Sequence, residues 1–187
     1  MPNLIQQIKT FVEDECKKPT SKYGYEPFPH HFVPMVARAK QLADQLGGDK
    51  ELIEIAARLH DIGSIIVGRE DHHITWAEIA GKKLTELNYP AEKIQLVKKC
   101  ILHHRGSMNH HRETLEEQII AEADIMSCFD NLPWLFNAAF TYEKMTQEQA
   151  RKSVKEKLEN KRNQLSFKES KQLIKPKYDA AMLLLNE

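Results

Sequence analysis

The sequence contains no apolar run that approaches the ~20 residues a membrane-spanning helix needs. It begins MPNLIQQIKT, with neither a basic leader nor a long apolar core, so no secretory signal is expected. It also lacks an excess of charge of either sign, because 27 lysines and arginines balance 27 aspartates and glutamates. This balance gives no argument for nucleic acid or a membrane surface as an obligate partner.

Cysteine, glycine and proline are also scarce, with 3, 7 and 8 residues in a chain of 187. Cys16, Cys100 and Cys128 are odd in number and widely spaced, with no Cys-x-x-Cys pair. We therefore expect reduced, small apolar side chains in a cytoplasmic protein. The sequence shows no strand-like alternation, no hairpin signal and no internal repeat, so an all-α fold of about seven to nine helices is predicted.

The length favours a single domain over 1–187. Residues 1–27 are expected to form an N-terminal helix and a loop, 28–142 a core, and 143–187 C-terminal helices that pack on the core or extend from it. Within the last segment, the highly charged residues 143–165 predict an exposed helix or arm. The rest reads as two short helices interrupted at Pro176.

The core is expected to contain five helices, whose signals are apolar spacing, capping boxes and breakers. They are residues 31–47 with Pro34 in the first turn, 51–63 ended by Gly63, a helix opened by a Thr75–Glu78 capping box, a helix from Pro90 to His104, and a helix opened by a Thr114–Glu117 capping box. Residues 64–75 and 105–113 are expected to be irregular.

Polar residues interrupt the apolar faces of these helices. In 51–63, ELIEIAARLHDIG, His60 falls on the stripe of Leu52 and Ala56, and Asp61 follows it directly. A buried carboxylate is costly unless a cation or strong hydrogen bonds compensate it.

His104 and Asp124 likewise fall on apolar faces further along the chain. Imidazoles and carboxylates aimed at one core indicate a bound cation, and nitrogen and oxygen ligands without a thiolate suit a divalent transition metal. Fe, Mn, Co, Ni and Zn all remain open, at one or two ions per chain.

These residues also carry a resemblance. The order His31, then His60-Asp61 within LHDIG, then Asp124 within EADIMSCFDN resembles the HD superfamily of metal-dependent phosphohydrolases. HITWAEIA at 73–80, preceded by His72, and ILHHRG at 101–106 resemble segments of the subgroup with extra histidines. The resemblance covers roughly residues 28–187 and implies an HD-type helical bundle.

The resemblance also implies roles for individual residues. His31, His60, Asp61 and Asp124 match the ligands of the core metal, and Asp61 would bridge two ions. His72 and His104 match the extra histidines of a dinuclear site. His73 or His103 could replace either of them, although His104 continues an apolar helix face and His103 points to its flank.

The implied reaction is attack on phosphorus by water that the metal activates. Asp61 and Arg105 are the residues expected to take part in catalysis, Arg105 as a phosphate contact; Lys98, Arg69 and Arg112 are weaker candidates. The substrate would be a nucleotide or another small phosphate ester. No Walker-type glycine loop is present.

Two alternatives remain open: a non-catalytic metal- and ligand-binding regulator, and a dinuclear-iron oxygenase. Each proposed ligand also has an ordinary structural interpretation, such as a core histidine bonded to a carbonyl group. Composition does not decide the oligomeric state, and a dimer is possible.

Overall fold

The computed structural model describes residues 3–68, 72–105 and 111–186, with the side chains of all of these except 72–74. In these ranges the chain is helical and contains no strand, which confirms the all-α prediction. The elements in order are α1 Leu4–Lys17, a π-helical turn Phe28–Phe32, α2 Val33–Leu46, α3 Lys50–Leu59, α4 Ile62–Ile66, α5 His72–Glu86, α6 Ala91–His103, α7 Leu115–Ser127, α8 Leu132–Thr141, α9 Gln147–Gln164 and α10 Lys168–Leu185.

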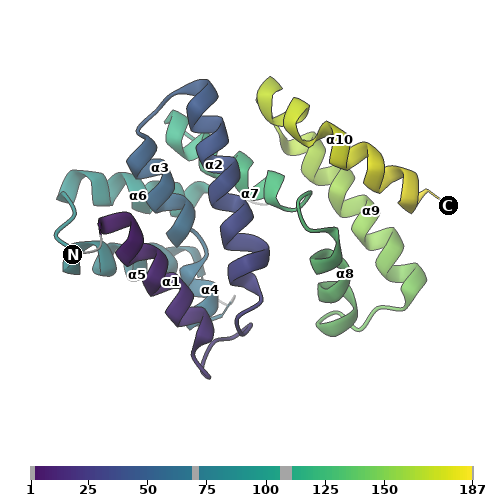
Figure 1. Ribbon diagram of the computed structural model, residues 1–187, viewed down its shortest axis with the longest axis horizontal. Helices are drawn as coiled ribbons and strands as arrows, with labels where there is room; N and C mark the ends of the chain where they lie inside the picture. Colours follow the sequence, from purple (N-terminus) through teal and green to yellow (C-terminus); the bar gives the residue numbers. More distant parts are fainter. Residues whose placement is uncertain (1–2, 69–71, 106–110, 187) are drawn as a thin grey trace.

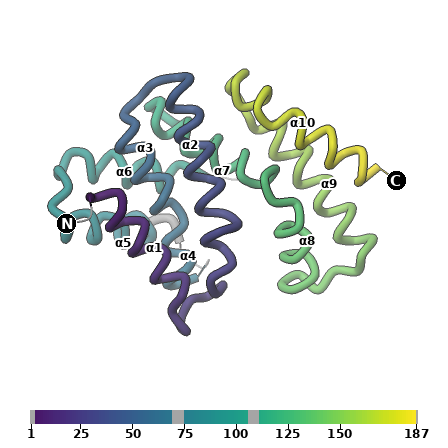
Figure 2. The backbone as a smooth tube through the Cα atoms, viewed as in Figure 1, coloured from purple at the N-terminus to yellow at the C-terminus, as the bar shows by residue number. Residues whose placement is uncertain are grey.

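The helices form two groups that meet at α7. Figure 1 shows α1 to α6 gathered on one side and α8 to α10 on the other, with α7 between them. Helix α7 packs against α2, α3 and α6 in the first group and against α9 and α10 in the second. The chain ends lie at opposite extremes of the molecule, as the tube in Figure 2 shows. The boundaries proposed for subdivisions of a single domain stay a prediction.

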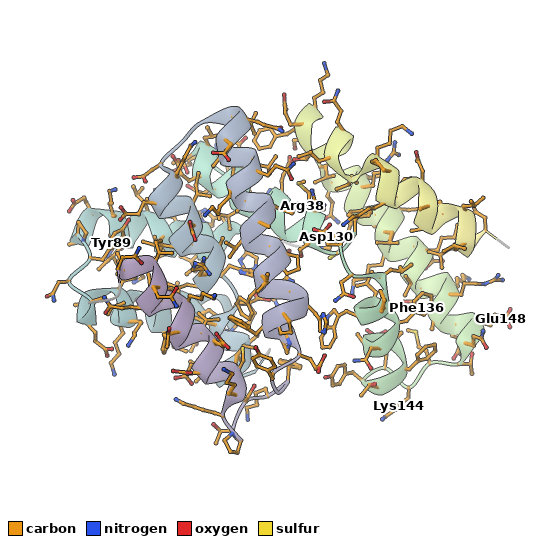
Figure 3. All side chains as sticks on the ribbon, in the orientation of Figure 1. Arg38, Tyr89, Asp130, Phe136, Lys144 and Glu148 are labelled. Atoms are coloured by element: carbon orange, nitrogen blue, oxygen red, sulfur yellow. The ribbon has the colours of Figure 1, made fainter. Side chains whose placement is uncertain are left out.

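Arg38 joins the two groups through Asp130. Its guanidinium donates from Nε to Asp130 Oδ2 at 2.8 Å and from one terminal nitrogen to Oδ1 at 2.5 Å. Lys177 of α10 contacts the same Oδ1 at 2.6 Å. Figure 3 labels Arg38 and Asp130 where α2 faces the segment that leads into α8. One carboxylate therefore connects α2, the start of α8 and α10.

Caps and apolar stripes explain where several helices begin and what they bury. Asn3, Asp49 and Thr114 each accept a hydrogen bond from the backbone N–H three residues later. On α3, a stripe of buried residues faces the core, as the spacing predicts: Leu52, Ile55, Ala56 and Leu59. This stripe delivers His60, which follows α3 and is fully buried, to the interior.

Three predictions about the first group were wrong. Gly63 does not end the helix that leads to His60; that helix, α3, stops at Leu59, and Gly63 lies inside α4. Residues 64–75 are not all irregular, because α4 runs to Ile66 and α5 starts at His72. Thr75 therefore lies within α5 and is not its cap.

The C-terminal segment also differs from expectation. Pro176 lies inside one continuous helix, α10, and does not divide it. The exposed position of Pro176 explains this, because the helix carbonyl that loses its N–H partner can be hydrated. Helix α9 is not exposed on all sides, since it buries Ala150, Val154 and Leu158. None of the described helices is long and apolar enough to cross a bilayer.

Candidate metal centre

Five predicted ligands converge at the side of α7 that faces the first group. His31 comes from the π-helical turn, His60 and Asp61 from the junction of α3 and α4, His104 from the end of α6, and Asp124 from α7. They form two overlapping triads that share His60: His31, His60 and Asp124, and His60, Asp61 and His104. Within each triad one ligand atom from each residue lies within 4.8 Å of the others.

Asp61 contacts histidines on both sides. Its Oδ2 lies 3.4 Å from His31 Nε2, and its Oδ1 lies 3.4 Å from His104 Nε2. Asp124 Oδ1 lies 3.6 Å from His31 Nε2 and 3.9 Å from His60 Nε2. Asp61 thus presents one oxygen to each part of the cluster, the arrangement that a bridging carboxylate requires.

Hydrogen bonds at Nδ1 determine how each imidazole faces the cluster. His60 Nδ1 lies 2.8 Å from the Ala57 carbonyl oxygen and His104 Nδ1 lies 2.6 Å from that of Ile101. A carbonyl oxygen only accepts, so Nδ1 carries the proton in both rings.

His31 reaches the same state through Ser127. The Ser127 hydroxyl donates to the Asp124 carbonyl oxygen at 2.8 Å, so it accepts from His31 Nδ1 at 3.3 Å. When neutral, all three histidines therefore turn an unprotonated Nε2 inward, as metal-ligating histidines do.

The donor set fits a divalent cation. His31 Nε2 and His60 Nε2 lie 2.9 Å apart, so two lone pairs would face each other unless a proton or a cation lies between them. Two or more imidazole nitrogens with carboxylate oxygens are ligands for first-row transition metals. The residues present could hold one ion at each triad.

The pKa values follow from the same contacts. Burial lowers the pKa of His60 to about 4. Burial opposes charge on His31 as well, but the hydrogen bond with Asp61 and the negative charge of Asp124 raise its pKa. Burial also opposes the negative charge of Asp61. The electrostatic effect of His60 and the hydrogen bonds with His104 and His31 nevertheless hold the pKa of Asp61 well below its ordinary value. The carboxylates of Asp61 and Asp124 are therefore ionised at neutral pH and able to bind a cation.

A cavity of about 750 Å³ opens onto the cluster. Its wall includes His31, Asp61, His104 and Asp124 from the cluster, together with Arg105. The Arg105 guanidinium carbon lies 4.9 Å from the centre of the Trp76 ring, which itself stacks on His104. Arg105 is therefore held beside the cluster, on the wall of the same cavity.

Lys157 and Lys161 of α9 line the same cavity, and sequence reasoning missed both. Lys161 Nζ lies 3.6 Å from Asp124 Oδ2, the oxygen turned away from the histidines. The pKa of Asp124 is lowered to about 2 although burial opposes its charge. Among the causes that lower it, the positive charge of Lys161 is the largest. The signal was available, because Lys161 continues the buried stripe of Ala150, Val154 and Leu158 at helical spacing.

Comparison with known proteins identifies the family. Residues 30–128, more than half of the chain, match the HD domain. The chain belongs to the HD-domain family. The match includes all five clustered ligands and stops before α8.

Solved structures show the same fold for this HD-domain chain. An HD-superfamily hydrolase from Bacillus thuringiensis is 18% identical, with a TM-score of 0.75 over 97% of this chain and 93% of that one. Bacillus subtilis YpgQ, solved in complex with ADP, is 17% identical, with a TM-score of 0.70 over 97% and 94%. A predicted HD-superfamily hydrolase from an uncultured Thermotogales bacterium is 25% identical, with a TM-score of 0.55 over 85% and 87%.

A curated but uncharacterized protein of Clostridium beijerinckii is 37% identical over 79 residues. The match spans 40% of this chain and half the length of that protein.

The remaining candidates lie elsewhere in the HD-domain structure. His103 Nδ1 lies 2.6 Å from Glu117 Oε2, so of the two adjacent histidines it is His104 that joins the cluster. Lys98 pairs with Glu78, and Arg112 donates to the backbone oxygens of His103 and Arg105. His72 and His73 open α5, but their side chains lie outside the described set, as does Arg69 altogether.

Proposed function

We propose that this HD-domain protein is a metal-dependent phosphohydrolase that acts on a nucleotide or another small phosphate ester. The observation that carries the proposal is one cavity that combines a histidine and aspartate cluster with three cationic side chains, those of Arg105, Lys157 and Lys161. A metal cluster alone suits many reactions. Cations placed around it suit a substrate that carries several negative oxygens.

In this proposal His31, His60, Asp61, His104 and Asp124 hold one or two divalent ions, and Asp61 would bridge the two ions where both are bound. His72 stays a proposed additional ligand. A divalent ion at these residues would supply a water of lowered pKa and positive charge opposite the phosphoryl oxygens. Fe, Mn, Co, Ni and Zn are all compatible with the nitrogen and oxygen ligands.

The cationic residues would bind and orient the phosphoryl group. Arg105 offers the planar guanidinium that pairs with two phosphoryl oxygens, and its contact with Trp76 limits its movement. Lys161 would divide its charge between Asp124 and a phosphoryl oxygen. By contacting both Asp124 and the substrate, Lys161 would keep the reacting phosphorus near the cluster.

Two observations support a nucleotide as the substrate: the size of the cavity and the ligand of one relative. The cavity volume of about 750 Å³ lies within the range of pockets that enclose small organic ligands. YpgQ, which shares the fold, was solved in complex with ADP.

The test is hydrolysis by purified protein stripped of metal and reloaded with Mn²⁺ or Co²⁺, on a panel of nucleotides and simple phosphate esters. We expect metal-dependent cleavage that His60→Ala and Asp61→Ala each reduce by at least about 10²-fold. His111→Ala, at an exposed histidine outside the cluster, is the matched control and should keep full activity.

Other outcomes would refute the proposal. Stoichiometric metal binding without cleavage of any ester would favour a regulator. Oxygen consumption by the iron-loaded protein, without ester cleavage, would favour an oxygenase. Hydrolysis that survives both cluster substitutions would place the reaction elsewhere.

A further inference from the structure

The cavity that holds the ligand cluster has a second, aromatic group of wall residues. Tyr23 from the loop after α1, Trp134 from α8 and Tyr142 at the end of α8 all line it. The ring centres of Tyr23 and Tyr142 lie 6.0 Å apart, and those of Trp134 and Tyr142 lie 6.4 Å apart. Both pairs are edge-to-face. The three side chains therefore form one continuous aromatic wall, with Tyr142 at its centre.

Core packing accounts for part of Tyr23 but not for Tyr142, the centre of this wall. Tyr142 is 50% exposed, although large aromatic side chains gain most from burial. Phe140, two residues earlier on the same helix, is similarly exposed at 43% but does not line the cavity. An aromatic ring that stays half exposed at a cavity wall is available to stack on a ligand.

The wall also lies outside the part of the chain that defines the family. The HD-domain match ends at residue 128, whereas Trp134, Tyr142, Lys157 and Lys161 all come after it. The ligand cluster is thus built from the family segment, and one side of the cavity from α8 and α9. A substrate that spans both would meet the ligand cluster on one side and residues outside the family match on the other.

We propose that the wall of Tyr23, Trp134 and Tyr142 binds the base of a nucleotide whose phosphate lies at the cluster. The inference rests on the proposed function for the position of the phosphate. Flat heteroaromatic rings stack well on tyrosine and tryptophan. Gln164 and Glu143 line the same cavity and offer polar atoms to the edge of a base, which a purely apolar ring would leave unused.

Stacking alone distinguishes a base from no base, and it distinguishes bases from one another only weakly. The decisive comparison is therefore between AMP and ribose 5-phosphate, which share the phosphate and the sugar. Discrimination is read from kcat/KM where the metal-loaded, full-length protein cleaves both, and from Kd by calorimetry where it only binds them. We expect AMP to be preferred by about ten- to a hundredfold, the usual effect of one stacked base.

The variants separate the wall from the helix that carries it. Trp134→Leu and Tyr142→Leu should each remove most of the preference for AMP and leave ribose 5-phosphate unchanged. Tyr142→Phe, which keeps the ring, should retain the preference. Phe140→Leu is the matched control on the same helix and should behave as the unaltered protein. Tyr142 is half exposed, so its substitution keeps the test valid even if Trp134→Leu fails to fold.

Equal handling of AMP and ribose 5-phosphate would overturn the inference, as would the same loss in Phe140→Leu as in Tyr142→Leu. Cleavage of both esters without discrimination would leave the phosphohydrolase in place and remove the base site. Ring-dependent binding of AMP with no cleavage of any ester would retain the base site and remove the phosphohydrolase. Failure to bind or cleave AMP at all would also overturn it.

Discussion

Gly63 lies directly against the indole of Trp76. A Cβ placed on Gly63 would be 1.7 Å from Trp76 Cδ1, far inside van der Waals contact. Trp76 is fully buried, and its ring stacks on His104 at a centroid distance of 6.3 Å. The glycine two residues after Asp61 therefore lets Trp76 approach and support a proposed ligand.

We predict that Gly63→Ala lowers the free energy of unfolding by about 3 kcal/mol, because the new methyl group must displace a fully buried indole ring. For a chain of this size the loss corresponds to a fall in Tm of roughly 6–12 °C. The measurement is urea or thermal unfolding. Gly81→Ala is the control, since its Cβ would come closest to Lys98 Cδ, at 3.1 Å on a flexible side chain, and would lie at ordinary contact distance from Ile94 Cγ2. If the two substitutions had equal effects, the contact with Trp76 would not explain the glycine.

Adjacent histidines offer a second test. His104 faces Asp61, whereas His103 binds the buried carboxylate of Glu117. We expect His104→Ala to weaken divalent metal binding by about tenfold or more, with little effect on Glu117. His103→Ala should leave metal binding intact and lower the free energy of unfolding by about 1–3 kcal/mol, because Glu117 loses a partner.

Elemental analysis after dialysis, together with calorimetric titration of Mn²⁺, would measure the first effect, and urea unfolding the second. Loss of one of two bound ions in His104→Ala would assign the second ion to the triad of His60, Asp61 and His104. Unchanged metal content in this variant would refute its role as a ligand.

Lys161 gives a third prediction, for a residue held between a ligand and the cavity. We expect Lys161→Met to lower kcat/KM by about 10²-fold, because it removes the charge next to Asp124 and a contact for the phosphoryl group. Lys161→Arg should restore much of the loss, whereas Lys152→Met, at an exposed position of α9, should have no effect.

The kinetic constants and the metal affinity of Lys161→Met separate its two proposed roles. A rise in KM with unchanged Mn²⁺ affinity would indicate substrate binding. A weaker Mn²⁺ affinity would indicate that Lys161 orients Asp124. No change in either would contradict both roles.

Local patterns in the sequence predicted which polar residues face the interior of their helices. The stripe of Leu52, Ala56 and Leu59 placed His60 in the interior, and helical spacing distinguished His104 from His103. The family resemblance added His31, which the structure brings to His60 Nε2.

The charge of residues 143–165 predicts an exposed helix, but the stripe of Ala150, Val154 and Leu158 gives α9 a buried face that also carries Lys161, and α9 packs against α7. The prediction for Gly63 is wrong for a similar reason. A glycine near a helix end satisfies the pattern of a stop, and its close approach to Trp76 depends on a helix that begins nine residues later. Pro176 predicts a break in the last helix, but the sequence does not reveal that Pro176 is exposed, and α10 continues through it.

Asp130 provides the last prediction, a stability effect that depends on pH. Burial opposes its charge, but the hydrogen bonds from Arg38 and Lys177 hold its pKa below the ordinary value of 3.8. A carboxyl group with a depressed pKa stabilises the folded state fully above its unfolded pKa, and the contribution is lost as pH falls through the folded value. We expect Asp130→Asn to lower the free energy of unfolding by about 2 kcal/mol at pH 7.

The difference between the unaltered protein and Asp130→Asn should persist at pH 5 and shrink below about pH 4, where protonated Asp130 becomes equivalent to the amide. Urea unfolding at pH 7, 5, 4 and 3 would measure it. Asp179→Asn, which removes an exposed pair with Lys175, is the control and should cost less than about 1 kcal/mol at every pH. A difference that stayed constant down to pH 3 would mean that the Asp130 carboxylate charge does not hold α2 and α10 together.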